Sequence, residues 1–148
     1  MEESKIVNAL ESLKKHPDLY LGLDFDNTQY FDLQNKLLSK IVMDVFLLEV
    51  KPITLDLIND MFVVFSEEDW LKKSLGADLT TEELFSRIVS IPEVGVNNMR
   101  SEIMLTAYAR NVLVSKKGDV TIIKGKFEDT FIADCIAKYS SGYFVAFN

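Results

Sequence analysis

The side chains that most often carry out chemistry are few in this chain of 148 residues, apart from its carboxylates. A single histidine, His16, cannot form a His-rich metal site, and a single cysteine, Cys135, cannot form an intramolecular disulfide. Local clusters of acidic residues begin at Asp24, Glu67 and Glu82. Carboxylates can act as general acids or bases, or can hold magnesium. The first cluster is typical of a capped loop and the others of the first turn of a helix, so spacing alone assigns no active site.

The overall composition narrows the class of protein. There are 16 basic and 23 acidic residues, which gives a net charge of −7 and argues against a nucleic-acid partner. The lysines at 116, 117, 124 and 126 are expected on a solvated face. No apolar run approaches the ~20 residues of a transmembrane helix, and the N-terminus lacks the pattern of a signal peptide. We therefore expect a cytoplasmic protein with no membrane partner.

Helices and antiparallel hairpins are expected to alternate along residues 1–148, as in a single α+β domain. Helical spacing of apolar residues predicts a helix over 4–15, ended by Pro17, and a second, buried helix over 31–49. Turn residues between alternating apolar segments predict hairpins over 53–65 and 112–124 and a last strand over 142–147. Further helices are expected from 66, over 80–90 and over 99–109, and Cys135 is expected to be a core residue of an alternating apolar stretch.

Residues 10–22 match a motif of the gyrase B nucleotide-binding domain without a gap. This chain reads Leu-Glu-Ser-Leu-Lys-Lys-His-Pro-Asp-Leu-Tyr-Leu-Gly where the family reads Leu-Glu-Ala-Val-Arg-Lys-Arg-Pro-Gly-Met-Tyr-Ile-Gly. The hairpin over 111–124 and the segment 141–147 are similar to later parts of that family, in the same order. The chain thus resembles the superfamily of gyrase, heat-shock chaperones, histidine kinases and MutL (GHKL, or Bergerat-fold, proteins). The resemblance implies a two-layer α/β sandwich whose mixed, mostly antiparallel sheet is covered on one face by helices, together with a site for ATP and magnesium.

The long helix of that family carries a glutamate as general base and an asparagine that holds magnesium. In the better register of this chain, Ile41 stands at the glutamate position and Val45 at the asparagine position. A shift of one residue offers Lys40 and Asp44 instead. Neither register supplies the glutamate that would take a proton from the attacking water. The resemblance therefore implies the fold without the hydrolytic residues.

The nucleotide-binding boxes of the family are also altered. In the Asp-x-Gly-x-Gly box, Glu67 could imitate the adenine-binding aspartate, but Glu68 and Trp70 replace the glycines. The glycine-rich lid, which cradles phosphates, retains only Gly95. Gly142 precedes a tyrosine where the family has threonine. If a nucleotide binds, the candidate residues are Asp44, Glu67, Gly95 and Gly142.

Asp24, Asp26 and Thr28 carry a different resemblance, to the Asp-x-Asp-x-Thr motif of haloacid-dehalogenase phosphatases. In that family the first aspartate attacks phosphorus and the second is an acid/base beside magnesium. The family also needs a buried strand before the first aspartate and a parallel sheet. Only residues 19–23 could form such a strand here, and the hairpins favour antiparallel pairing. The phosphatase remains an alternative.

Matching fold markers and missing chemical markers together predict a non-catalytic, gyrase B-like domain that acts through a protein partner. We expect no catalytic residue, no metal ligand and no cofactor, with Ile41, Val45 and Trp70 packed where relatives hold ATP. A nucleotide binder without hydrolysis, using ATP and magnesium, is the first alternative. The sequence does not name the partner, but an exposed sheet edge could pair with a second copy to form a homodimer.

Overall fold

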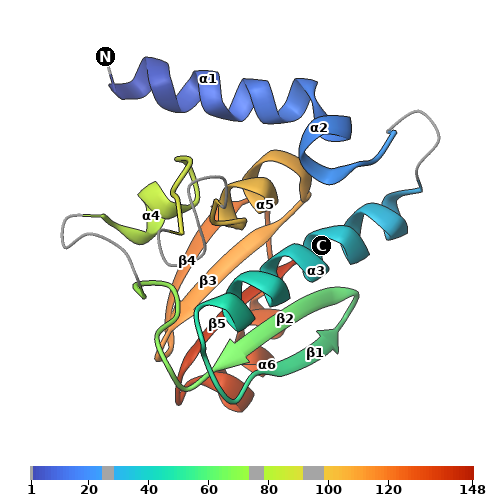
Figure 1. The fold of residues 1–148 in the computed structure, drawn as a ribbon. Coiled ribbons are helices and arrows are strands. Elements are labelled where there is room, and N and C mark those ends of the chain that lie inside the picture. Colours follow the sequence, from blue (N-terminus) through green and yellow to red (C-terminus); the bar gives the residue numbers. More distant parts are fainter. Residues whose placement is uncertain (1, 25–28, 74–78, 92–98) are drawn as a thin grey trace.

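The computed structural model describes residues 2–24, 29–73, 79–91 and 99–148 (Figure 1). The helices are α1 (Glu2–Lys15), α2 (Pro17–Leu21), α3 (Tyr30–Leu47), α4 (Thr81–Leu84), α5 (Glu102–Tyr108) and α6 (Asp129–Tyr139). The strands are β1 (Thr54–Ile58), β2 (Met61–Ser66), β3 (Val112–Lys116), β4 (Asp119–Lys124) and β5 (Tyr143–Phe147). The predicted α+β class is confirmed, and so are both hairpins, the long helix and the last strand.

The five strands form one sheet in the order β1-β2-β5-β3-β4, and all of these pairings are antiparallel. Each hairpin closes with two residues of positive φ, Asn59-Asp60 between β1 and β2 and Lys117-Gly118 between β3 and β4. Such turns match the right-handed twist of the strands they join. The last strand, β5, then joins the two hairpins at the centre of the sheet.

Helices cover both faces of this sheet (Figure 1). Strand β5 explains why, because four consecutive residues of it are buried and successive side chains point to opposite faces. Val145 and Phe147 belong to the core that also contains residues of α1, α3 and α5. Phe144 and Ala146 belong to a second core with α6. Helices were expected on one face of the sheet, and α6 covers the other face as well. The described strands pair only antiparallel, whereas a mixed sheet was expected.

Helix α6 is a difference from the sequence-based expectation, which placed Cys135 in an alternating stretch. Its buried residues are Phe131, Cys135 and Tyr139, which recur every four residues as on one side of a helix. The thiol is in the core as expected, and burial raises its pKa to about 11. The alternation was misinterpreted because partly buried Ile132 and other apolar residues lie between the buried ones.

One predicted helix is absent, one is reduced to a single turn, and the helix expected over 99–109 is the shorter α5. Ser66 ends β2, and its hydroxyl accepts a hydrogen bond from the Glu68 N–H at 3.1 Å, which makes a turn where we expected a helix to begin. The helix expected over 80–90 is the single turn α4, and the Ser86 hydroxyl beyond it donates back to the Glu82 carbonyl at 2.9 Å. Local serine side chains compete with the helical backbone in both places.

The segment that resembles gyrase B contains the break between α1 and α2. Pro17 is the first residue of α2, where its missing N–H costs nothing. Gly22 ends α2 with φ of 67°, and its N–H donates to the Asp18 carbonyl at 2.9 Å. These two residues therefore have clear structural roles here. Among the described helices, none combines the length and the apolar character required to cross a lipid bilayer.

Candidate functional site

Four buried polar residues gather where α3 passes the beginning of α5. Asp44 comes from α3, Arg100 and Ser101 directly precede α5, and Glu102 is its first residue. Burial of three ionisable groups in one place is costly unless each is paired. Their pairing therefore decides what chemistry this part of the molecule can do.

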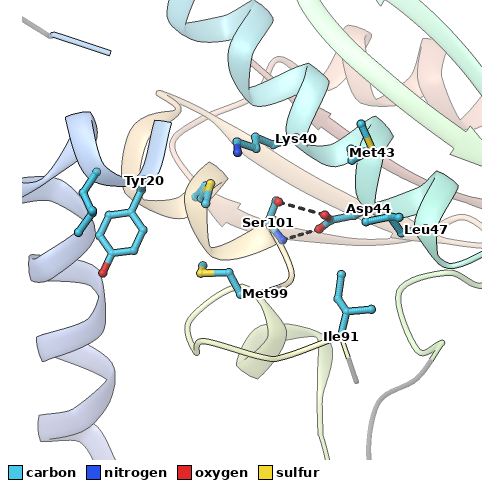
Figure 2. A pocket seen from close by; sticks show the side chains of 10 residues that line it. Tyr20, Lys40, Met43, Asp44, Leu47, Ile91, Met99 and Ser101 are labelled. Carbon is cyan, nitrogen blue, oxygen red and sulfur yellow. Dashed lines mark hydrogen bonds between the residues drawn. The ribbon is translucent and has the colours of Figure 1, made fainter. Parts of the chain in front are cut away.

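Both oxygens of the Asp44 carboxyl accept hydrogen bonds from Ser101 (Figure 2). The Ser101 N–H donates to Asp44 Oδ2, and the Ser101 hydroxyl donates to Oδ1 at 3.2 Å. Burial raises the pKa of the Asp44 carboxyl to about 7, and the nearby Glu102 carboxylate adds to this rise. The carboxyl thus connects α3 to the N-cap residue of α5, and both of its oxygens already accept hydrogen bonds.

Arg100 connects the same region to the segment that follows β2. Its guanidinium is paired with the Glu102 carboxylate, with Nη2 to Oε1 at 2.6 Å. It also donates to two main-chain carbonyls, those of Trp70 at 3.1 Å and of Lys73 at 2.9 Å. The charge is 1% exposed and is fully engaged by these partners. Arg100 is therefore not available to bind a phosphate group without breaking this network.

The apolar residues expected to fill the site are in the core. Ile41 and Val45 on α3 are 1% and 0% exposed, and Trp70 is also fully buried. The Trp70 indole Nε1 has no hydrogen-bond partner among the residues that the structure describes, which costs stability. Hydrocarbon thus occupies the positions of α3 at which the resemblance would place a general base and a metal ligand.

A hollow of about 340 Å³ lies beside this cluster, between α3 and the loop that leads into α5 (Figure 2). Its polar lining includes Lys40, Asp44 and Ser101, and Met43 and Met99 line it as well. In Figure 2, Lys40 and Met43 extend from α3 above the Asp44–Ser101 pair, with Met99 on the other side. The volume is at the lower end of the ~300–1,000 Å³ that small-molecule sites occupy.

The predicted nucleotide-binding residues do not all meet in this place. Asp44 lines the hollow, whereas Glu67 is exposed and lies beside Gly142 at the ends of β2 and β5. A Cβ at Gly142 would lie 2.4 Å from the Ser66 carbonyl oxygen, so close approach of two strands already explains this glycine. Gly95 lies outside the described residues. Within the described part of the chain, no hydrogen bond or ion pair joins Glu67 to Asp44.

The aspartates of the alternative phosphatase motif lack the framework that the motif needs. Asp24 is exposed, and Asp26 and Thr28 lie outside the described residues. The preceding residues form helix α2 rather than a buried strand, and the described strands pair only antiparallel. The fold therefore offers this alternative no support.

Sequence reasoning missed Arg100, Ser101 and Glu102, which complete the polar cluster. An arginine, a serine and a glutamate before an apolar helix look like an exposed helix start, and nothing local signals their burial. Among the described residues, no group of histidine, cysteine or carboxylate side chains is arranged to hold a metal ion. Comparisons of this chain with protein-family models, with curated proteins and with solved structures find no match.

Proposed function

We propose that this chain is a non-catalytic domain of gyrase B (GHKL) type that works through contacts with a protein partner. The observation that carries the proposal is the burial of Ile41 and Val45 in the core. Hydrolysis of ATP needs a carboxylate near an attacking water, and a metal ion beside the phosphates. Neither isoleucine nor valine can serve in those roles.

The charges around Ile41 and Val45 support the same proposal. Arg100 is held by Glu102 and by two main-chain carbonyls, so its charge is already neutralised. Glu102 is paired with Arg100, so Asp44 is the carboxyl whose negative charge, when it is ionised, would repel a triphosphate. Asp44 accepts from Ser101 at both oxygens, which leaves it poorly placed to activate a water molecule.

Thermal unfolding with ATP and magnesium tests this proposal. A ligand at ~100 times its Kd stabilises the folded state by about 2.7 kcal/mol. For a domain of this size, such a change raises Tm by roughly 5–10 °C. We expect no shift with ATP and magnesium relative to magnesium alone, and no release of phosphate. A shift of that size, or measurable hydrolysis, would refute the proposal.

A nucleotide binder without hydrolysis is a second candidate, and the hollow beside Asp44 is the observation that favours it. Lys40 would supply the positive charge for a phosphate group there. Under this alternative, Lys40→Ala removes an ATP-induced rise in Tm. Lys36→Ala, which changes an exposed lysine one turn earlier on α3, leaves that rise intact. A rise that survives both substitutions would exclude the hollow as the site.

A second copy of the chain is one candidate for the protein partner. Strands β1 and β4 form the two edges of the described sheet. An edge strand presents main-chain N–H and C=O groups that can pair with another strand. Both edges are therefore possible places for association.

A further inference from the structure

Exposed apolar side chains concentrate along the β1 edge of the sheet. Of the eight large apolar side chains that are exposed among the described residues, four lie here. They are Phe31 and Phe46 of α3 and Leu55 and Leu57 of β1, which together we call the β1 face. Phe46 is 65% exposed and Leu57 is 60% exposed. Apolar surface gathered in this way typically marks an interaction site.

The β1 face is formed by β1 and α3 on one side of the sheet. Leu55 pairs with Val64, which is in the core with α3, and residues paired across strands share a face. A hollow of about 240 Å³ lies between Phe31 and Leu57. Another, of about 530 Å³, lies beside Phe46 and Lys51. Phe31 thus lies near the end of β1 and Phe46 near the residues that precede it. Helix α3 therefore runs antiparallel to β1 (Figure 1).

The main chain of β1 also points its pairing groups outward in this region. Ile58 and Met61 close a two-residue turn, and such a closing pair is hydrogen-bonded. Alternate residues of β1 then bond to β2, which turns the N–H and C=O groups of Leu55 and Leu57 away from it. The Leu57 N–H is accordingly held by the adjacent Asp56 Oδ1 at 2.8 Å, not by β2.

We propose that a second copy of this chain pairs with the β1 edge, with the two β1 strands antiparallel about a two-fold axis at Asp56. The residues whose main-chain groups point outward, Leu55 and Leu57, must lie opposite each other across the two copies. A register centred on Asp56 meets this condition and pairs all five residues of β1 with β1 of the second copy. It places Leu55 of each copy opposite Leu57 of the other. Two five-stranded sheets would then form one of ten strands. The proposal rests on the proposed function only in that the domain works through protein contacts.

The charges at the ends of β1 favour a second copy as the occupant. Exposed Lys51 precedes β1, and exposed Asp60 lies in the turn that follows it. Antiparallel pairing about Asp56 brings Lys51 of each copy beside Asp60 of the other. The two Asp56 carboxylates would face each other, but each is already paired with Lys138 of its own chain at 2.7 Å. Each end of the contact therefore gains one pair of opposite charge, Lys51 with Asp60, although Glu49 beside Lys51 has the same charge as Asp60.

The apolar groups are self-complementary as well. Because α3 runs antiparallel to β1, the two-fold axis brings Phe46 of one copy towards Phe31 and Leu57 of the other. The hollow of about 240 Å³ between those residues could receive part of the Phe46 ring. Aromatic anchors in such hollows are typical of stable interfaces. A surface that matches itself in this way is what an isologous dimer requires.

Sedimentation of the full chain tests whether the dimer forms. At about 100 μM, a dimer with a Kd of ~1 μM is nearly complete, and dilution should dissociate it. Leu57→Lys is expected to weaken association at least ~10-fold, because a charge would enter the paired face. Ile122→Lys, which changes an exposed apolar residue of the other edge strand, should leave it unchanged. A monomer at about 100 μM, or equal effects of both substitutions, would overturn the proposal.

Cross-linking tests the register. Asp56→Cys should form a disulfide with itself, because residue 56 lies opposite its own copy at about 4.5 Å between Cα atoms. Thr54→Cys should not, because its own copy lies four residues away, roughly 13 Å along the strand. Cys135 is buried in α6 and cannot contribute. Equal cross-linking of the two variants, or none in a proven dimer, would exclude this register.

A mixture of variants guards against misfolding of Asp56→Cys. Leu55→Cys and Leu57→Cys chains, mixed in equal amounts, should cross-link more than either variant alone, and no excess in the mixture also excludes the register. Failure of this pairing is distinguishable from failure of the proposed function. ATP-induced stabilisation would refute the proposed function and leave the dimer intact. A monomeric chain would refute only the β1 pairing.

Discussion

The buried carboxyl of Asp44 should make the stability of this protein fall as pH rises. Burial raises its pKa from the ordinary 3.8 to about 7 in the folded chain. Between these values the folded chain binds one more proton than the unfolded chain does. The free energy of unfolding therefore loses about 1.4 kcal/mol per pH unit from this group. Over roughly three units the loss is about 4 kcal/mol.

Asp44→Asn isolates this effect, because an asparagine keeps the shape of the side chain and stays neutral at all pH values. Its amide oxygen can accept from the Ser101 N–H, and its amide nitrogen can donate to the Ser101 hydroxyl. The variant should gain stability relative to the natural chain as pH rises from 4 to about 7, and the difference should then become constant.

Urea denaturation at a series of pH values measures the free energies of unfolding of both chains. Asp32→Asn is the matched control, because it makes the same change at an exposed position in the first turn of α3. Because residue 32 is exposed and residue 44 is buried, the effect of burial is expected in the Asp44→Asn difference and not in the control. A flat difference for Asp44→Asn would refute the reasoning about burial.

Three further single substitutions and one double variant test the packing of the core, of the sheet and of the buried ion pair by urea denaturation. Ile41→Ala should lower the free energy of unfolding by about 2–5 kcal/mol, because it opens a cavity in the core. Gly142→Ala should also destabilise the chain, since a Cβ there would lie 2.4 Å from the Ser66 oxygen. Arg100→Met should cost about 3–5 kcal/mol because Glu102 loses its partner, and adding Glu102→Gln should recover much of this loss. Full stability in any single variant would contradict the packing described for it.

The sequence predicted the elements whose signals are local. The turn pairs Asn59-Asp60 and Lys117-Gly118 lie between alternating apolar segments, and both hairpins formed as expected. Helix α6 was missed because its stripe of buried residues is interrupted by other apolar side chains. The order of strands in the sheet was not predicted either, because it depends on β5 reaching back between the hairpins.

The candidate site was less predictable than the fold. Asp44 was named only because a one-residue shift of register brought it into the family pattern. Its partner, Ser101, is 57 residues away in the sequence, so the pair depends on how α3 packs against α5. The same holds for Arg100, whose bonds to the carbonyls of Trp70 and Lys73 span 30 and 27 residues. Every residue has a main-chain carbonyl, so the residue types in a sequence do not show which carbonyls will accept a hydrogen bond from an arginine.

The central place of β5 has a consequence for how the chain folds. The β1–β2 and β3–β4 hairpins each contain only neighbouring segments and can form early. Among the described strands, β5 is the one that pairs with both hairpins. Residues 143–147 follow all other described elements, so during synthesis on a ribosome the two hairpins must wait for them. Until then, β2 and β3 each have an unpaired edge, on the side where β5 will bind. Cooperative folding of this chain should therefore begin only after Phe147 has left the exit tunnel.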